Sequence, residues 1–291
     1  MTKASTIAAI RQRRATMKAV GLLTRRRRMP RQQQPDAIRL AYFAALLKVL
    51  GRARQLVREQ LEPELPHLVE RATLTRADSA THLDETSSLN RIIDAITNDW
   101  YAEFPNEKLA ELANLYADRT SDFQREQLAK QFKAALGIDL YRSEPWLAPK
   151  IAGFTAENVA LIKSVAQRHF NDLETNLAAG LREGQRWEDL AALIEDRYGV
   201  AESSAKLVAR DQIGKLFSDL NKTRQKSLGV SRYTWRGMQD NRERDEHLAL
   251  EGQEFSWDDP PEEGDPGTPI NCRCYGAPVF DDLLTEGDDT A

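Results

Sequence analysis

Apolar residues in the first half of the chain recur every three or four positions, which is the spacing of amphipathic helices. The pattern predicts a helix over 36–61, followed by helices at 66–76, 84–104 and 107–136, the last ending at Gly137. Because the links between them are short, these helices should pack as antiparallel neighbours.

The helical pattern breaks at 137–154, which holds two prolines and two glycines, and then resumes. We expect one helix that begins at a Thr155 cap, a second that stops at Gly199 and a third that stops at Gly229. After Gly229 the residues "VSRYTWRG" predict a short strand, and prolines and glycines interrupt the loops that follow. The expected fold class is mainly α, with a helical bundle followed by a small α+β C-terminal module.

The net charge of -4 conceals two ends of opposite sign. The first 35 residues contain ten basic side chains and no acidic one, whereas residues 240–291 contain 16 acidic side chains and three arginines.

A chain of 291 residues suggests about two domains. We divide it into a basic disordered arm (1–35), a helical domain (36–136), a second helical part (137–229), a small, loop-rich α+β module (230–280) and an acidic tail (281–291).

The basic arm has the composition of a segment that binds a polyanion. Blocks of like charge with few apolar residues usually stay disordered, and arginine is well suited to a phosphate backbone. A solubilising tail and an Arg-rich organelle-targeting peptide are the two other interpretations. The candidate contacts to double-stranded DNA are Arg11, Arg13, Arg14, Arg25, Arg26, Arg27, Arg28 and Arg31.

Two classes of protein are disfavoured by composition. The longest apolar stretches fall well short of the roughly 18 residues that a membrane-spanning helix needs, so we expect no membrane partner. The chain has two cysteines, Cys272 and Cys274, which is too few for a disulfide framework. A reducing compartment is therefore the default expectation.

The C-terminal module carries an ordered set of residues that resembles a known family. The set runs through Trp235, Asp240, Arg242, Arg244, His247, Leu250, Gly252, a Pro/Gly stretch and Cys272-Arg273-Cys274. Each piece alone is weak, but the order is similar to that of the phage head-morphogenesis, or minor head protein, family that includes phage Mu F-like proteins. The resemblance covers roughly residues 137–280, and Glu243 stands where an apolar residue is expected.

The resemblance implies a non-enzymatic virion protein, present in few copies in the interior of the phage head near the portal. It implies a role in head morphogenesis and in DNA packaging or ejection. The expected partners are the portal protein, scaffold or other head proteins and double-stranded DNA. The chain would lie in the host cytoplasm during assembly.

The two cysteines admit two interpretations. Lying on the same side of an extended segment, they can face a small core as compact apolar residues, with Trp235 packed against them and His247 capping them by hydrogen bond. This interpretation is favoured, and no metal or other cofactor is then needed. Alternatively, His247, Cys272 and Cys274 supply three ligands to Zn²⁺, with Asp240 or Asp245 as the fourth.

An enzyme is the alternative from another class. Asp240, Asp245 and His247 could bind a metal for nuclease-like chemistry or act as general acid and base. The same carboxylates could instead form ion pairs with Arg242 and Arg244. Because the chain has no phosphate-binding loop, no His-Glu-x-x-His and no nucleophile elbow, the non-enzymatic interpretation is favoured.

Overall fold

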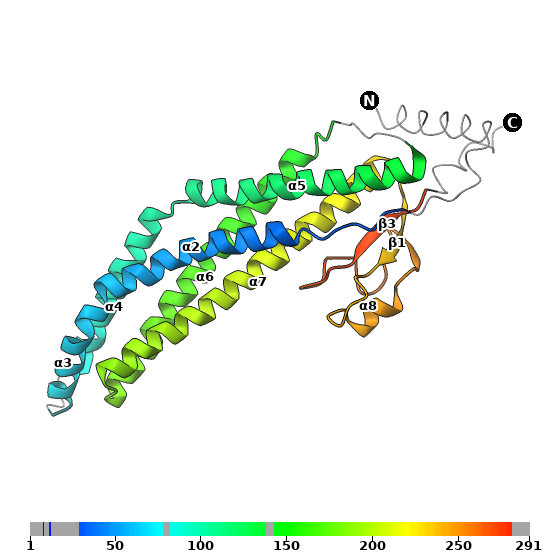
Figure 1. Ribbon diagram of the computed structural model, residues 1–291. Coiled ribbons are helices and arrows are strands. Elements are labelled where there is room, and N and C mark those ends of the chain that lie inside the picture. The colour runs from blue at the N-terminus through cyan, green and yellow to red at the C-terminus, as the bar shows by residue number, and fades with distance from the viewer. Residues whose placement is uncertain (1–7, 9–11, 13–28, 78–81, 138–142, 281–291) are drawn as a thin grey trace. The chain divides into compact units, whose positions relative to one another are not determined.

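The structure is a computed structural model that describes residues 29–77, 82–137 and 143–280 and the single positions 8 and 12. Helices make up most of it, and one small sheet lies near the C-terminal end of the chain (Figure 1). This confirms the expected mainly α class with a small α+β module. The elements are α2 (Asp36–Gln60), the 3₁₀ turn η2 (Glu62–Glu64), α3 (Leu65–Ala77), α4 (His82–Glu103), α5 (Asn106–Leu136), α6 (Leu147–Glu183), α7 (Trp187–Ser227), β1 (Arg232–Arg236), α8 (Asp245–Ala249), β2 (Glu254–Ser256) and β3 (Tyr275–Pro278).

Two predicted helix boundaries are wrong. Helix α6 begins at Leu147, and Thr155 is a buried residue inside it whose hydroxyl bonds the Asn114 side chain. Pro149 was expected to break the helix, but it lies in the first turn, where a backbone N–H has no helical partner to lose. Helix α7 passes through Gly199, which is exposed and has no positive φ.

The apolar face of α7 explains why Gly199 does not end it. Buried residues continue on both sides of the glycine, at Leu190, Ile194, Ala201 and Ala205. A glycine in a helix costs about 1 kcal/mol relative to alanine, which is less than the burial of these side chains contributes. By contrast, Gly137 and Gly229 adopt φ of 68° and 90° and end α5 and α7 as predicted.

The described residues belong to two compact units, each discontinuous along the chain. Unit 1 comprises Met1–Arg39, Tyr116–Ala152 and Arg210–Ala291, and unit 2 comprises Leu40–Leu115 and Gly153–Ala209. Each unit therefore combines residues from both halves of the sequence. The boundaries drawn from the sequence at 136 and 229 stay predictions. Among the described residues, no helix has the length and apolar character that crossing a membrane requires.

Unit 2 has an aromatic core around Trp100, which is fully buried. The indole N–H of Trp100 donates to the backbone carbonyl of Val49 at 3.2 Å. The rings of Phe104 and Phe170 lie 5.2 and 6.3 Å from it between centroids. Aromatic contacts of this kind add about 0.5–1.5 kcal/mol to the area that they bury.

His169 makes unit 2 sensitive to acid. Its side chain is 4% exposed, and burial lowers its pKa to about 4. An unfolded histidine titrates near pH 6.5, so between about pH 6.5 and pH 4 the unfolded chain binds the proton and the folded chain does not. Stability is therefore complete above about pH 6.5 and falls as the pH drops through this window.

We expect His169→Gln to remove part of this acid sensitivity. The wild-type chain should lose about 2–3 kcal/mol more than the variant between pH 7.5 and 4.5, because one pKa unit corresponds to about 1.4 kcal/mol. Urea denaturation at the two pH values measures this difference. His67→Gln, at an exposed position of α3, is the control. Equal pH dependence in the wild type and His169→Gln would contradict the prediction.

Unit 1 contains a buried network of side-chain amides centred on Asn221, which is 1% exposed. Its Oδ1 accepts hydrogen bonds from the amides of Gln32, Gln124 and Gln225 at 2.9, 3.0 and 3.1 Å. Its Nδ2 donates to the backbone carbonyl of Gly276 at 2.9 Å. The network therefore joins the segment before α2, helices α5 and α7, and strand β3.

The segment 29–35 is packed in unit 1, although the sequence placed it at the end of the disordered arm. Gln32 is 3% exposed, and Met29 packs against the cluster that contains Phe132. Arg31 donates to the side chain of Gln239 at 2.9 Å. Residues 29–35 therefore belong to the folded unit and are not part of a free arm.

The sheet has the strand order β2-β1-β3, and both pairings are antiparallel. Strand β1 lies beside β3, with Trp235 opposite Gly276 (Figure 1). A Cβ atom at position 276 would lie 2.5 Å from the Trp257 ring, so only glycine fits there. Tyr233 and Trp257, with ring centroids 4.0 Å apart, complete a buried cluster with Trp235, Cys272 and Cys274.

Candidate functional site

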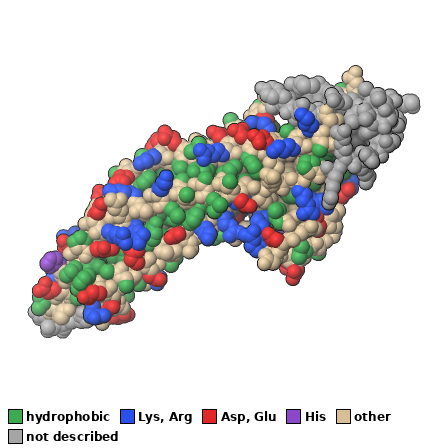
Figure 2. Space-filling view, viewed as in Figure 1, with side chains coloured by type: hydrophobic (Ala, Val, Ile, Leu, Met, Phe, Trp, Pro, Cys, Tyr) green, Lys and Arg blue, Asp and Glu red, His purple; other side chains and the backbone are tan. Residues whose placement is uncertain are grey.

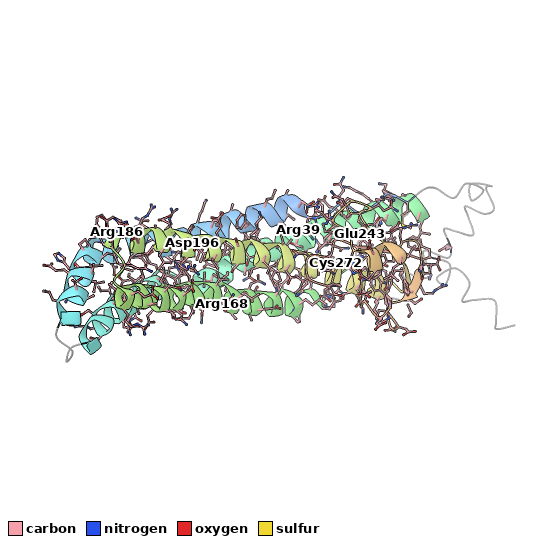
Figure 3. The ribbon with its side chains drawn as sticks, turned by 90° about the horizontal axis from the view of Figure 1, so that it is seen from below. Arg39, Arg168, Arg186, Asp196, Glu243 and Cys272 are labelled. Atoms are coloured by element: carbon pink, nitrogen blue, oxygen red, sulfur yellow. The ribbon has the colours of Figure 1, made fainter. Side chains whose placement is uncertain are left out.

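The candidate site lies in the C-terminal module, where three segments that are distant in sequence meet. The turn after β1 contributes Glu243, helix α8 contributes His247, and the loop before β3 contributes Cys272 and Cys274. Figure 3 shows Glu243 and Cys272 in the same region of the module. As expected from the sequence, Trp235 packs against the two cysteines.

A tight turn fixes the position of the cysteine pair. The N–H of Cys272 donates to the carbonyl of Pro269 at 2.9 Å, and Asn271 adopts a left-handed φ of 60°. Asparagine tolerates this conformation better than most residues because its short amide can bond the local backbone. Arg244 holds the same loop, donating to the carbonyl of Ile270 at 2.8 Å.

Helix α8 places His247 inside the module. It is a short helix whose first turn carries Asp245 and Glu246, which suits the positive end of the helix dipole. His247 is 2% exposed, and its ring lies edge-on to Trp235 with centroids 5.5 Å apart. Gly252, at a φ of 82°, donates its N–H to the carbonyl of Trp235 and so returns the chain to β1.

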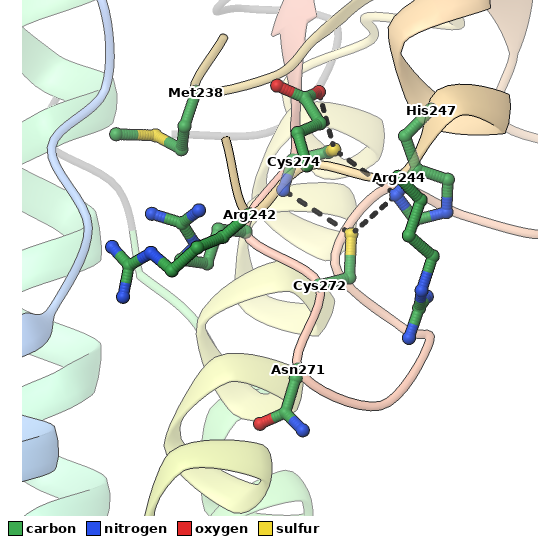
Figure 4. Close-up of a pocket in the computed structure, with 9 residues that line it drawn as sticks. Met238, Arg242, Arg244, His247, Asn271, Cys272 and Cys274 are labelled. Atoms are coloured by element: carbon green, nitrogen blue, oxygen red, sulfur yellow. Dashed lines mark hydrogen bonds between the residues drawn. The ribbon is translucent and has the colours of Figure 1, made fainter. Parts of the chain in front are cut away.

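The sulfur atoms of both cysteines face the same nitrogen of His247 (Figure 4). The distances to Nδ1 are 3.5 Å from Cys272 Sγ and 3.6 Å from Cys274 Sγ. The N–H of Cys274 also donates to Cys272 Sγ at 3.4 Å. The ligand atoms of the three residues all lie within 4.8 Å of one another.

Glu243 extends the cluster. Its Oε1 lies 3.5 Å from Cys274 Sγ, while its Oε2 accepts the N–H of Gln239 at 2.5 Å. The carboxylate lies over Gly237, where a Cβ atom would come 1.6 Å from Oε1. Glycine at 237 and the left-handed φ of 57° at Gln239 therefore make room for this carboxylate.

The two thiols have different proton affinities. The pKa of Cys272 is lowered to about 6 because the Cys274 side chain and backbone N–H both donate to its sulfur. The pKa of Cys274 is raised by its hydrogen bond to Cys272, by burial and by the nearby carboxylate of Glu243. In the protein alone, Cys272 is thus the first of the pair to become a thiolate.

A small pocket of about 70 Å³ adjoins the cluster (Figure 4). The volume suits an ion or a few water molecules and is small for an extended organic substrate. Three of the residues that line it are basic, namely Arg242, Arg244 and Arg273.

The carboxylate of Asp240 forms an ion pair with an arginine. Its carboxylate pairs with the guanidinium of Arg273, with one contact at 2.7 Å and one shorter, and lies 3.6 Å from Arg242. Hydrogen bonding from Arg273 lowers the pKa of Asp240 to about 2. Asp245 is exposed in the first turn of α8. Among the described residues, the group of metal-binding type that converges is His247, Cys272 and Cys274, without Asp240 or Asp245.

The sequence did not predict that Glu243 joins the cysteine cluster, nor that side-chain amides form a buried network. For Glu243, the available signal was an acidic residue at a position where an apolar one is expected. For the amide network, the available signal was Asn221 and Gln225, which lie four residues apart within the buried face of α7.

Of the candidate DNA contacts, Arg31 is described, whereas Arg11, Arg13, Arg14 and Arg25–Arg28 lie outside the described residues, as does the acidic tail 281–291.

Comparison with known proteins confirms the family resemblance over part of the chain. Residues 171–276 match the family model for Phage Mu protein F like protein, a segment that includes the end of α6, the whole of α7, β1, α8 and β2, and the cysteine loop. An uncharacterized protein of Haemophilus influenzae is 33% identical over 174 residues, which are 58% of this chain and 39% of that protein. The chain therefore spans about two fifths of the length of this relative. No solved structure matches.

Proposed function

We propose that this chain is a minor head protein of a phage, acting in head morphogenesis near the portal. The observation that carries the proposal is the match of residues 171–276 to the phage Mu F-like family. This segment forms the folded C-terminal module and the helix that leads into it. Docking on the portal or on scaffold and other head proteins rests on that match, and we assign it to the helical body.

The second part of the proposal is a DNA contact through the basic arm, within the head during packaging or ejection. On the face seen in Figure 2, basic and acidic side chains are interspersed along the helices. Many of them form ion pairs, such as Arg54 with Glu195 and Lys150 with Asp219. The arm, with ten basic side chains and no acidic one in residues 1–35, is the most concentrated positive charge of the chain.

The amide network supports this role for the arm. Because Gln32 is held by Asn221 and Gln131 at 2.9 Å each, the C-terminal end of the arm is anchored to unit 1. A basic segment that begins at a fixed point can reach DNA without moving the folded body. The protein acts in this proposal as a structural component, not as an enzyme.

Quantitative mass spectrometry of purified heads tests the proposal. Heads and their precursors would be isolated from the strain that encodes the chain and separated by density. We expect the protein in both, in few copies relative to the major capsid protein. Its absence from every head fraction, with the protein abundant in the free pool of the same lysate, would overturn the proposal.

A further inference from the structure

We propose that the C-terminal module binds one Zn²⁺ ion through His247 Nδ1, Cys272 Sγ, Cys274 Sγ and a carboxylate oxygen of Glu243. The inference does not depend on the proposed function. It revises the interpretation of the cysteines that the sequence favoured, which needed no metal. It also replaces Asp240 and Asp245 as the candidate fourth ligand, because Asp240 pairs with Arg273.

The spacing of the ligand atoms is that of a tetrahedral zinc site. With Zn–S near 2.3 Å and Zn–N or Zn–O near 2.0–2.1 Å, tetrahedral angles place a sulfur about 3.5–3.6 Å from a nitrogen or oxygen ligand. The observed distances are 3.5 and 3.6 Å from the sulfurs to His247 Nδ1, and 3.5 Å from Cys274 Sγ to Glu243 Oε1. Three edges of the tetrahedron are thus already formed.

Hydrogen bonding alone does not account for this arrangement. The Nδ1 atom of a neutral imidazole carries either one lone pair or one hydrogen, so it can make one good hydrogen bond to a sulfur but not two at once. Both sulfurs nevertheless face Nδ1, at 3.5 and 3.6 Å. A metal ion at the centre satisfies Nδ1 and both sulfurs together.

The surroundings suit a charged centre. Two thiolates and a carboxylate leave one negative charge after a divalent ion is bound, and Arg242, Arg244 and Arg273 line the adjoining pocket. Glu243 Oε2 is held by the N–H of Gln239, which leaves Oε1 to face the ion. Metal-binding carboxylates in proteins are usually oriented by such a second hydrogen bond.

The ligand set selects the class of metal. Thiolate and imidazole ligands favour Zn²⁺ over Mg²⁺ or Ca²⁺, which prefer oxygen. All four ligand positions are filled by protein side chains, which is typical of structural zinc. The ion would join the turn after β1, helix α8 and the loop before β3, in a module with little regular secondary structure of its own.

The test uses the full-length reduced protein, purified without chelator. We expect about one equivalent of zinc per protein chain, measured by elemental mass spectrometry. After exchange, Co²⁺ should give thiolate-to-metal charge-transfer absorption together with the intense visible bands of tetrahedral cobalt. Zinc far below one equivalent after incubation with excess Zn²⁺, with no charge-transfer absorption on adding Co²⁺, would overturn the proposal.

Glu243→Gln tests the fourth ligand, with Glu246→Gln on the exposed side of α8 as the matched control. Loss of a ligand should weaken zinc affinity by at least about tenfold, the lower limit seen even for second-shell changes. It should also shift the visible cobalt bands, which a purely structural effect would not do. Zinc affinity and cobalt bands equal to those of Glu246→Gln would exclude Glu243 from the site.

Discussion

Replacing Arg224 by methionine is expected to lower the free energy of unfolding by about 3 kcal/mol, the lower end of the range for breaking a buried ion pair. The Arg224 side chain is 3% exposed and bonds Glu144 at 2.6 and 2.9 Å. It also donates to the carbonyl of Ser121 at 2.8 Å and to Gln124 Oε1 at 2.7 Å. Methionine fills much of the space but donates no hydrogen bond, so the Ser121 carbonyl and Gln124 Oε1 lose this donor, while Glu144 keeps its bond from Arg125.

Arg125→Met is the matched control, because Arg125 bonds the same carboxylate of Glu144 at 2.8 Å but is 48% exposed. An exposed ion pair contributes at most about 1 kcal/mol, so this variant should change stability little. Urea denaturation followed by tryptophan fluorescence compares the two. An equal loss in the free energy of unfolding for both substitutions would contradict the prediction, because the buried ion pair would then contribute no more than the exposed one.

Removing residues 1–28 is expected to abolish most DNA binding by the protein. Contacts to phosphates release counterions, so affinity should fall with salt with a logarithmic slope near -0.9 per contact. Four to six engaged arginines would then cost the full chain roughly 10²–10³ in affinity between about 50 and 200 mM salt. Ending the deletion at residue 28 keeps Gln32 in the amide network of unit 1.

Gel shifts on unrelated DNA sequences at several salt concentrations measure this effect. Replacing Arg25–Arg28 by alanine should reduce the salt slope, whereas Arg168→Gln, at an exposed position of α6, should not (Figure 3). Removing the acidic residues 281–291 should strengthen binding, because they compete for the same arginines. If the arm-deleted chain binds as tightly and with the same slope as the full chain, the arm is not the DNA contact.

The sequence predicted the ends of two helices correctly, because a glycine follows the last apolar residue of each helical pattern. Gly137 and Gly229 end α5 and α7 because each adopts a left-handed φ directly after an apolar helical pattern. Gly199 resembles them in sequence, but the buried face of α7 continues past it. Tertiary burial decides between these cases, and a local pattern cannot reveal it.

The cysteine cluster was predicted in part. The order of Trp235, His247 and the two cysteines in the chain was enough to expect them in one small core. Glu243 could not be assigned to it, because its position depends on the turn made by Gly237 and the left-handed Gln239. Asn221 likewise depends on the packing of Gln32 and Gln124 from distant segments.

Co-purification with a portal oligomer is the most direct test of a minor head protein. The full chain and the arm-deleted chain would each be co-expressed with the portal protein of the same phage and passed through affinity and size-exclusion columns. Because docking is assigned to the helical body, both chains should elute with the portal oligomer. If neither does, while both remain folded by circular dichroism, portal docking by this chain is contradicted.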